Sequence, residues 1–219
     1  RTFRMRHTAW GPEMSSPACQ AALEKAGIPC QSLNPKELTE TAAEQLSQGK
    51  IIGWFQGRME FGPRALGNRS ILADTRNKEN WQKVNLKIKF REKFRPFAPS
   101  ILEEQVGEWF EIDEPTPYME KVFPIREEKR SQIPAVTHVD GSARAQTVSA
   151  SQNPEMYALL EAFRTQTGYG VLCNTSLNFN GRGFINRMSD LVAYALQTGL
   201  DGFVVDGTVY RRRDHAGVS

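Results

Sequence analysis

The apolar residues of this chain follow two recurring patterns, which predict interspersed strands and helices. Short apolar runs bounded by glycine, proline or asparagine are typical of buried strands. They occur at residues 28–33, 50–55, 70–73, 100–102, 170–174, 202–206 and 208–210. Apolar residues at helical spacing predict helices at residues 16–26, 35–48, 78–90, 154–167 and 189–197, and a helical turn at residues 105–110.

Local signals mark several ends of these elements. Asn34 and Asn153 each precede a proline at the first position of a predicted helix, an arrangement favoured for capping. Asp-Gly pairs predict two hairpins, one between the runs 134–139 and 144–148 and one around Gly207. Because hairpins interrupt strict β-α alternation, the predicted fold class is α/β (α+β), with a twisted mixed sheet flanked by helices.

Composition and charge narrow the class of protein. With 219 residues, of which 39% are hydrophobic, the chain suits one large domain, or one domain with a small appendage, and can form a core. Its net charge is only +3, but basic residues gather at 83–95 and acidic residues at 103–114, which indicates a local positive patch. No run approaches the roughly 18 apolar residues of a membrane helix, and no apolar stretch resembles a signal peptide. We therefore expect a cytoplasmic protein with no membrane partner.

The cysteines and the first residue add two expectations. Cys19, Cys30 and Cys173 lack metal-site spacing and leave an odd cysteine over, which fits a reducing compartment. We expect no metal site in this chain. The chain does not begin with methionine, and we expect it to be a fragment of a longer protein.

The densest candidate chemistry lies at residues 57–72, here called the glycine–arginine segment. It carries three glycines and three arginines between two predicted strands. Glycines let a backbone approach a ligand closely, and arginine forks match phosphate or carboxylate. It is not a P-loop, because Pro63 and Arg64 stand where that motif needs lysine and serine or threonine. A phosphate site is our first interpretation, and an ordinary turn with solvated arginines is the alternative.

Three further segments complete a recognisable set. They are residues 91–100 (REKFRPFAPS), 137–148 (THVDGSARAQTV) and 173–178 (CNTSLN). Together with the glycine–arginine segment, they resemble the C-terminal domain of the carbamoyltransferases that modify antibiotics and nodulation factors, of the tobramycin and cephamycin type. The resemblance runs from about Trp10 to Asp206.

That resemblance implies a fold similar to threonylcarbamoyl-adenylate synthase, called YrdC-like. It implies an ATP-dependent O-carbamoyltransferase in which this domain converts carbamoyl phosphate and ATP, with Mg²⁺, into carbamoyl adenylate. The carbamoyl group then passes to a hydroxyl of a natural-product or sugar acceptor. An N-terminal actin-like domain of the same polypeptide, which holds iron or another metal, would bind that acceptor. We accordingly expect residues 1–15 to be a linker from that domain, 16–212 the YrdC-like domain and 213–219 a tail.

Such a reaction brings several negative charges together, which calls for convergent cationic side chains. We predict His138, Arg69 and Arg95 as catalytic residues. For substrate binding we predict Arg64, Ser70, Lys89, Arg91, Asp140, Arg144, Gln146, Asn174, Ser176 and Asn178.

The candidates for binding phosphate form two groups, which would lie on opposite sides of the predicted cleft. Arg64, Arg69 and Ser70 would cradle phosphate oxygens. Lys89, Arg91 and Arg95 would line the facing wall, although a solvated helix face is an equal alternative for Lys87 and Lys89.

The remaining candidates follow from strand geometry. Alternation puts His138 and Asp140 on one face of a strand, and Arg144 and Gln146 on one face across the turn. A lone histidine is more often structural than catalytic. Asn174, Ser176 and Asn178 follow a buried strand, where ligands of α/β sheets tend to bind, and their groups suit a carbamoyl NH₂ and carbonyl.

One departure from the family pattern and one alternative function remain open. After Asn178 the family commonly continues with Gly-Glu-Pro, whereas this chain has Gly181-Arg182-Gly183. Arg182 places a positive charge where the family has a negative one, which affects either the choice of acceptor or the contact of this loop with the other domain. The alternative is an RNA-binding or tRNA-modification-related YrdC-like module. The low net charge and the single basic patch argue against a nucleic-acid partner.

Overall fold

The molecule is built around one large mixed sheet. The computed structural model describes residues 5–14, 16–90, 96–112, 114–179 and 181–211. In the order in which they pair, the strands of the sheet are β1 (Cys30–Ser32), β10 (Thr208–Arg211), β9 (Gly202–Val205), β2 (Ile52–Phe55), β3 (Arg69–Asp74), β8 (Val171–Ser176), β4 (Ala98–Leu102) and β7 (Gln146–Val148). A small second sheet joins β5 (Phe123–Pro124) and β6 (Ser142–Ala143).

Parallel and antiparallel pairs are both present in the large sheet. Strand β2 runs parallel to β9, and β4 runs parallel to β7, whereas β3 is antiparallel to both β2 and β8. The predicted closing hairpin is confirmed, because β9 and β10 pair antiparallel around Gly207. The predicted class, a mixed sheet flanked by helices, is therefore confirmed.

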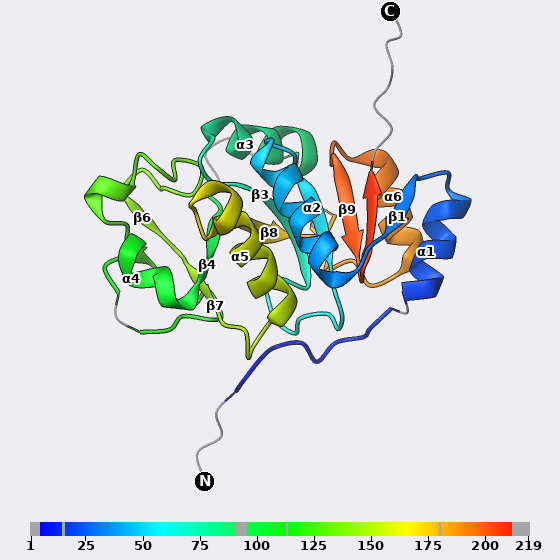
Figure 1. The fold of residues 1–219 in the computed structure, drawn as a ribbon, viewed down its shortest axis with the longest axis horizontal. Coiled ribbons are helices and arrows are strands. Elements are labelled where there is room, and N and C mark those ends of the chain that lie inside the picture. Colours follow the sequence, from blue (N-terminus) through cyan, green and yellow to red (C-terminus); the bar gives the residue numbers. More distant parts are fainter. Residues whose placement is uncertain (1–4, 15, 91–95, 113, 180, 212–219) are drawn as a thin grey trace, which may run out of the picture.

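Helices cover both faces of the sheet. The longer ones are α1 (Ser16–Lys25), α2 (Pro35–Ser47), α5 (Pro154–Thr167) and α6 (Met188–Gln197). The shorter ones are α3 (Lys78–Lys83), which continues into a π-helical turn (Val84–Ile88), and α4 (Val106–Trp109), with 3-10 turns at Glu103–Gln105 and Glu127–Lys129. Figure 1 shows α2 and α5 side by side over one face of the sheet.

Two cores result, one on each face, because successive strand residues point to opposite sides. Leu72 of β3 and Leu172 of β8 pack with α2 and α5. Ile71 and Cys173, their neighbours along the same strands, pack with α1 and α6 on the other face. The central strands are therefore buried on both sides, which explains their near-continuous apolar sequence.

The predicted helix starts are confirmed. The Asn34 side chain accepts a hydrogen bond from the Glu37 amide (3.0 Å), and the Glu37 carboxylate accepts one from the Asn34 amide (3.2 Å). These two bonds form a capping box. Asn153 likewise accepts a bond from the Met156 amide at 3.0 Å.

The hairpin predicted at residues 134–148 is wrong. Residues 134–139 form turns, in which the Ala135 amide donates to the Thr75 carbonyl at 3.1 Å. Strand β7 exists, but it pairs with β4, which lies far away in the sequence. The reverse turn around Gly141 does form, as the Asp-Gly pair predicted. The predicted pairing of the two flanking runs with each other does not.

The N-terminal residues pack more closely than predicted. Residues 5–14, which belong to the predicted linker at residues 1–15, run beside the start of the glycine–arginine segment. The Gly11 amide donates to the Met59 carbonyl (2.9 Å), and the Phe61 amide donates to the Thr8 carbonyl (2.7 Å). Arg58 adds two bonds, to the carbonyls of Trp10 and Gly11, each at 3.0 Å. This stretch is therefore a part of the domain surface.

None of the helices in the described part of the chain has both the length and the apolar character needed to cross a lipid bilayer.

The packing of β2 against β9 gives a direct test of the sheet. A Cβ atom placed on Gly53 would lie 2.5 Å from a ring carbon of the buried Phe203. We expect Gly53→Ala to lower the free energy of unfolding by roughly 1–3 kcal/mol, measured by denaturant titration. Gly183→Ala is the control, because nothing lies within 4 Å of its Cβ position. Equal stability of the two variants would contradict this packing.

Candidate active site

The glycine–arginine segment satisfies its own backbone groups. One oxygen of the Glu60 carboxylate, Oε1, accepts hydrogen bonds from three backbone amides: Leu66 (2.8 Å), Asn68 (2.7 Å) and Arg69 (3.2 Å). The Gly67 amide donates to Ser70 Oγ at 3.1 Å. Amides that could have held a phosphate are therefore occupied within the protein. Sequence reasoning gave Glu60 no role.

Arg69 points into the protein. Its side chain is fully buried, and its guanidinium donates to the carbonyls of Gln56 (2.9 Å), Gly57 (2.9 Å) and Asn68 (3.0 Å). The guanidinium also stacks on the Phe55 ring, 3.5 Å from its centre. Burial lowers the pKa of Arg69 to about 10, which leaves the group charged at neutral pH.

These contacts correct two predicted roles. A buried guanidinium needs several acceptors, and Arg69 finds them in the carbonyls of its own segment. Ser70 is also fully buried and accepts a bond from Gly67. Within the described parts of the chain both side chains are fully buried and bond to their own segment, so they support the segment and do not reach a surface where the predicted phosphate contacts could form.

Two arginines of the segment line cavities: Arg58 borders a larger cavity described below, and Arg64 lines a small one. This small cavity, of about 120 Å³ and here called the arginine cavity, is lined by Pro63, Arg64, Pro96, Arg144, Asn174 and Ser176, among others. Asn174 and Ser176 lie near the C-terminal end of β8, and Arg144 lies between β6 and β7. The structure therefore brings together four of the predicted substrate-binding residues from three separate parts of the chain.

The electrostatics of the arginine cavity favour an anion. Among the described residues that line it, none is acidic. The pKa of Arg144 is lowered, first by burial and then by repulsion from Arg64, so the two positive charges sense each other. The Nε atom of Arg144 is buried and has no hydrogen-bond partner in the described parts of the chain. An anion between the two guanidinium groups would relieve the repulsion and satisfy this donor.

A buried polar network forms the floor of the arginine cavity. Asn174 Nδ2 donates to Ser100 Oγ (2.9 Å), Gln146 Oε1 (3.2 Å) and the Ala65 carbonyl (3.2 Å). Its Oδ1 atom is buried without a partner among the residues that the structure describes. Ser100 is a second residue that sequence reasoning missed; the only signal was a serine within an apolar strand.

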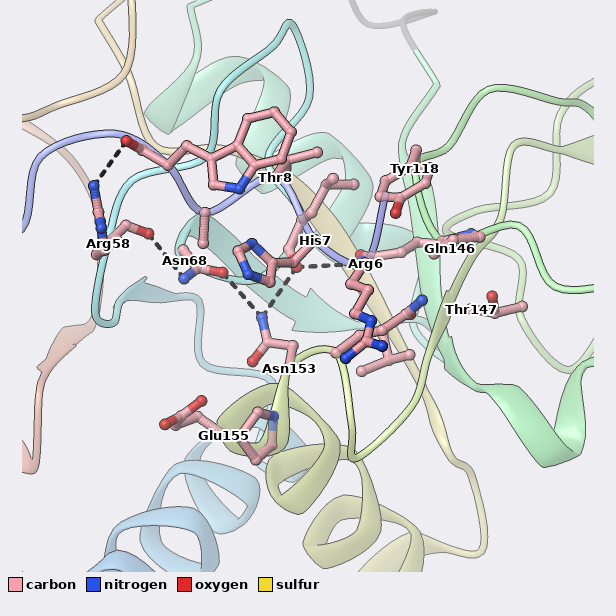
Figure 2. Close-up of a pocket in the computed structure, with 17 residues that line it drawn as sticks. Arg6, His7, Thr8, Arg58, Asn68, Tyr118, Gln146, Thr147, Asn153 and Glu155 are labelled. Atoms are coloured by element: carbon pink, nitrogen blue, oxygen red, sulfur yellow. Dashed lines mark hydrogen bonds between the residues drawn. The ribbon is translucent and has the colours of Figure 1, made fainter. Parts of the chain in front are cut away.

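Gln146 and Asn153 hold the glycine–arginine segment from its other side. Gln146 Nε2 donates to the Leu66 carbonyl at 2.9 Å, and Asn153 Nδ2 donates to Asn68 Oδ1 at 3.0 Å (Figure 2). Both line a second cavity, of about 440 Å³, which Arg6 and His7 also border. Gln146 thus supports the arginine cavity from behind and does not line it.

Lys89 is a buried bridge. It is 5% exposed, and its Nζ donates to the carbonyls of Ser176 (2.8 Å) and Asn178 (3.1 Å) and to Asn178 Oδ1 (2.5 Å). Ser176 Oγ also donates to Asn178 Oδ1, at 2.8 Å. This rules out the solvated-face alternative for Lys89. Arg91 and Arg95 lie outside the described residues, as does the side chain of Lys87.

His138 and Asp140 border a third cavity, of about 540 Å³, which shares Pro96 with the arginine cavity. Burial lowers the pKa of His138, against the attraction of Asp140 and a hydrogen bond to the Phe97 backbone. The two residues lie in a turn, so the predicted strand face is wrong. Asp140 Oδ1 accepts bonds from the Ser142 amide (3.0 Å) and hydroxyl (2.6 Å), which fixes the turn.

No metal-binding group was found among the described residues, where no three histidine, cysteine, aspartate or glutamate side chains gather closely enough to hold an ion.

Comparison with solved structures identifies the class of fold. Full-length HypF, solved in its phosphate- and nucleotide-bound form, superposes with a TM-score of 0.55 at 14% identity, over 80% of this chain and 25% of that chain. A variant of P. abyssi Sua5 superposes with a TM-score of 0.53 at 14% identity, over 77% of this chain and 46% of that one. The fold is therefore the predicted YrdC/Sua5-like domain.

Comparison with protein families identifies the group within that class. Residues 43–212 match the family described as "Carbamoyltransferase C-terminus", and the chain belongs to this family, as the sequence motifs predicted. The nodulation protein NolNO of Sinorhizobium fredii is 44% identical over 214 residues, 96% of this chain and 32% of that protein. The 3'-hydroxymethylcephem-O-carbamoyltransferase of Amycolatopsis lactamdurans is 52% identical over 169 residues, 77% of this chain and 32% of that protein. The chain thus spans about a third of the length of these relatives.

The buried position of Arg69 predicts a loss of stability on its removal. Arg69→Ala would leave three carbonyls without their donor, and we expect the free energy of unfolding to fall by roughly 3–5 kcal/mol in denaturant titrations. Arg58→Ala is the matched control, since Arg58 also donates to two carbonyls but lies on the surface. We expect that control to cost about 1 kcal/mol. An Arg69→Ala protein of unchanged stability would contradict the structural role.

The environment of His138 predicts a pH dependence. Its pKa in the folded protein lies below the ordinary value of 6.5, so the unfolded chain binds the proton more readily. Stability should therefore fall as the pH drops through about 6.5, and this component should be absent from His138→Gln. An NMR titration, assigned by comparison with that variant, should give a midpoint below 6.5. A midpoint above 6.5 would contradict the burial argument.

Proposed function

We propose that this domain converts carbamoyl phosphate and ATP into carbamoyl adenylate, within an O-carbamoyltransferase. The observation that carries the proposal is the pair Arg64 and Arg144, two arginines beside one small cavity with no acid among the described residues that line it. Family membership and the name of the cephem relative support carbamoyl transfer as the overall activity.

The proposed reaction balances with one water molecule. Water attacks the carbonyl carbon of carbamoyl phosphate and releases inorganic phosphate, which leaves carbamate. A carbamate oxygen then attacks the α-phosphorus of ATP and displaces pyrophosphate. The products are carbamoyl adenylate, phosphate and pyrophosphate, and each bond that breaks leaves its electrons on a phosphate oxygen.

In the arginine cavity, the phosphate of carbamoyl phosphate lies between Arg64 and Arg144. Two guanidinium groups neutralise its charge and stabilise the charge that develops on the leaving oxygen. Asn174 Oδ1, which is buried and without a partner among the described residues, accepts a bond from the carbamoyl NH₂. Its amide nitrogen is held by three acceptors, so this oxygen is fixed in orientation.

His138 acts as the base for the attacking water. Burial favours its neutral form, which can accept a proton near neutral pH. His138 borders the third cavity, which adjoins the arginine cavity at Pro96. In this role the imidazolium that forms is stabilised by Asp140, which attracts the charged form.

The nucleotide occupies the neighbouring third cavity. Its volume of about 540 Å³ lies within the roughly 300–1,000 Å³ common for small-molecule sites, whereas the arginine cavity is too small for a nucleotide. Trp81 and Pro96 offer surfaces for a base, and Lys78 and Arg130 offer charge for phosphates. Mg²⁺ arrives on the polyphosphate as part of the substrate. Lys89, Arg91, Ser176 and Asn178 remain predicted substrate-binding residues, and Arg95 remains a predicted catalytic residue.

Transfer to the acceptor hydroxyl requires groups outside this chain. The chain spans about a third of its relatives, and we propose that the remainder of the polypeptide, an actin-like domain with its metal, binds the acceptor. The acceptor would be a natural product or a sugar. Carbamoyl adenylate formed here would then donate its carbamoyl group there.

The direct test is product release by the purified chain. We expect pyrophosphate and phosphate in equal amounts when ATP, Mg²⁺ and carbamoyl phosphate are all present, and no pyrophosphate when carbamoyl phosphate is omitted. Hydrolysis of ATP to ADP with no pyrophosphate would contradict the proposal.

Arg144 gives a matched mutational test. Arg144→Ala should lower the rate of pyrophosphate release by roughly 100–1,000-fold, as for loss of one oxyanion donor. Arg144→Lys should recover part of the loss, because lysine keeps the charge without the fork. Arg187→Ala, an exposed arginine at the start of α6, is the control and should retain the wild-type rate. A wild-type rate in Arg144→Ala would show that the anion binds elsewhere.

A further inference from the structure

Glu60 closes a short arc of the glycine–arginine segment on itself. Its side chain is 1% exposed, and its Oε1 accepts the Leu66 amide at 2.8 Å, which ties the two ends of residues 61–65 together. The same oxygen accepts the Asn68 amide at 2.7 Å. Residues 61–65, here called the arc, carry Arg64 near their end.

Two other hydrogen bonds hold the arc, one near each end. At its start, the Phe61 amide donates to the Thr8 carbonyl at 2.7 Å. Phe61 is 72% exposed, and Gly62 adopts a φ of 127°, a conformation that side chains other than glycine rarely adopt. The Ala65 carbonyl accepts the bond from Asn174 at 3.2 Å. Glu60 therefore sets the direction in which the arc leaves the sheet, and with it the direction of Arg64.

Charge gives a reason for a carboxylate at this position. Three converging amides form a concave donor site that favours a negative oxygen over a neutral one. The second oxygen, Oε2, is buried without a hydrogen-bond partner in the described parts of the chain. The buried guanidinium of Arg69 supplies the opposite charge, and its interaction with Glu60 favours the charged form of Arg69.

The arc also has to withstand a repulsion. Arg64 and Arg144 are like charges close enough to interact, and without an anion between them Arg64 gains by swinging into solvent. A flexible arc would allow that movement, and the binding of an anion would then have to reorder it. A closed arc keeps Arg64 at the cavity before the anion arrives.

We propose that Glu60 is a positioning residue for anion binding, which acts through Arg64 by fixing the arc. The inference rests on the proposed function of the arginine cavity, because it concerns how that cavity keeps its two arginines together. Glu60 touches no substrate, and its whole effect passes through the position of Arg64.

A double-mutant cycle on the full chain tests this. The probes are inorganic phosphate and carbamoyl phosphate, and the measurement is their dissociation constant by calorimetry. Glu60→Gln keeps an oxygen at this position but removes the charge, and we expect it to weaken binding about 5–10-fold. In an Arg64→Ala background, the same change should weaken binding less than about 2-fold, because Arg64 is no longer there to be positioned.

Stability is measured alongside, since Glu60 is also structural. Glu37→Ala, which removes the acceptor of the Asn34 amide and so breaks the capping box of α2, is the control: it should lower stability and leave phosphate affinity unchanged. If Glu60→Gln does not fold, Glu60→Asp takes its place in the cycle, because it keeps the charge but is one carbon too short for the three amides.

Each outcome decides a separate point. Wild-type chain that binds neither probe overturns the proposed function of the cavity. Wild-type chain that binds, with Glu60 variants equally weakened in both backgrounds, leaves the cavity intact as a proposal but overturns the positioning role. Loss of the Glu60 effect in the Arg64→Ala background supports it.

Discussion

The candidate site depends on how the buried backbone of the glycine–arginine segment finds hydrogen-bond partners. Residues 59–68 of the segment belong to no helix or strand, and their amides and carbonyls would be costly to bury without partners. Glu60 accepts from the amides and Arg69 donates to the carbonyls, so that two opposite side-chain charges replace regular secondary structure. These contacts of Glu60 and Arg69 form a frame that positions Pro63, Arg64 and Ala65, the residues of the segment that line the arginine cavity.

The frame explains why arginines so close in sequence have different tasks. Arg69 begins β3, where its side chain points inward, stacks on Phe55 and holds carbonyls. Arg64 lies outside the strand, on the arc, and faces Arg144 at the cavity. Asn174, Ser100 and Gln146 complete the arrangement from the neighbouring strands, because each bonds either the segment or another member of the network. The cavity is thus lined by the arc and by residues of β4 and β8, and Gln146 of β7 supports it from behind.

Sequence reasoning predicted most of the helices and the central strands, and its errors share one cause. Helix starts at Asn34 and Asn153 depend on neighbours in sequence, and both were predicted. The hairpin at 134–148 failed because β7 pairs with a distant strand, which no local pattern reveals. Composition likewise shows that arginines are abundant in the segment but not which of them is buried. Glu60 carried no signal at all, since a single glutamate in a polar loop is ordinary until three amides are seen to converge on it.

The central claim is that Arg64 and Arg144 together bind the phosphate of the substrate. A crystal structure of the chain soaked with inorganic phosphate would test this most directly. The account predicts difference density between the two guanidinium groups, within hydrogen-bond distance of both, and its loss in crystals of Arg144→Ala. Phosphate bound instead in the cavity beside Arg6 and His7, with the arginine cavity holding only water, would contradict it.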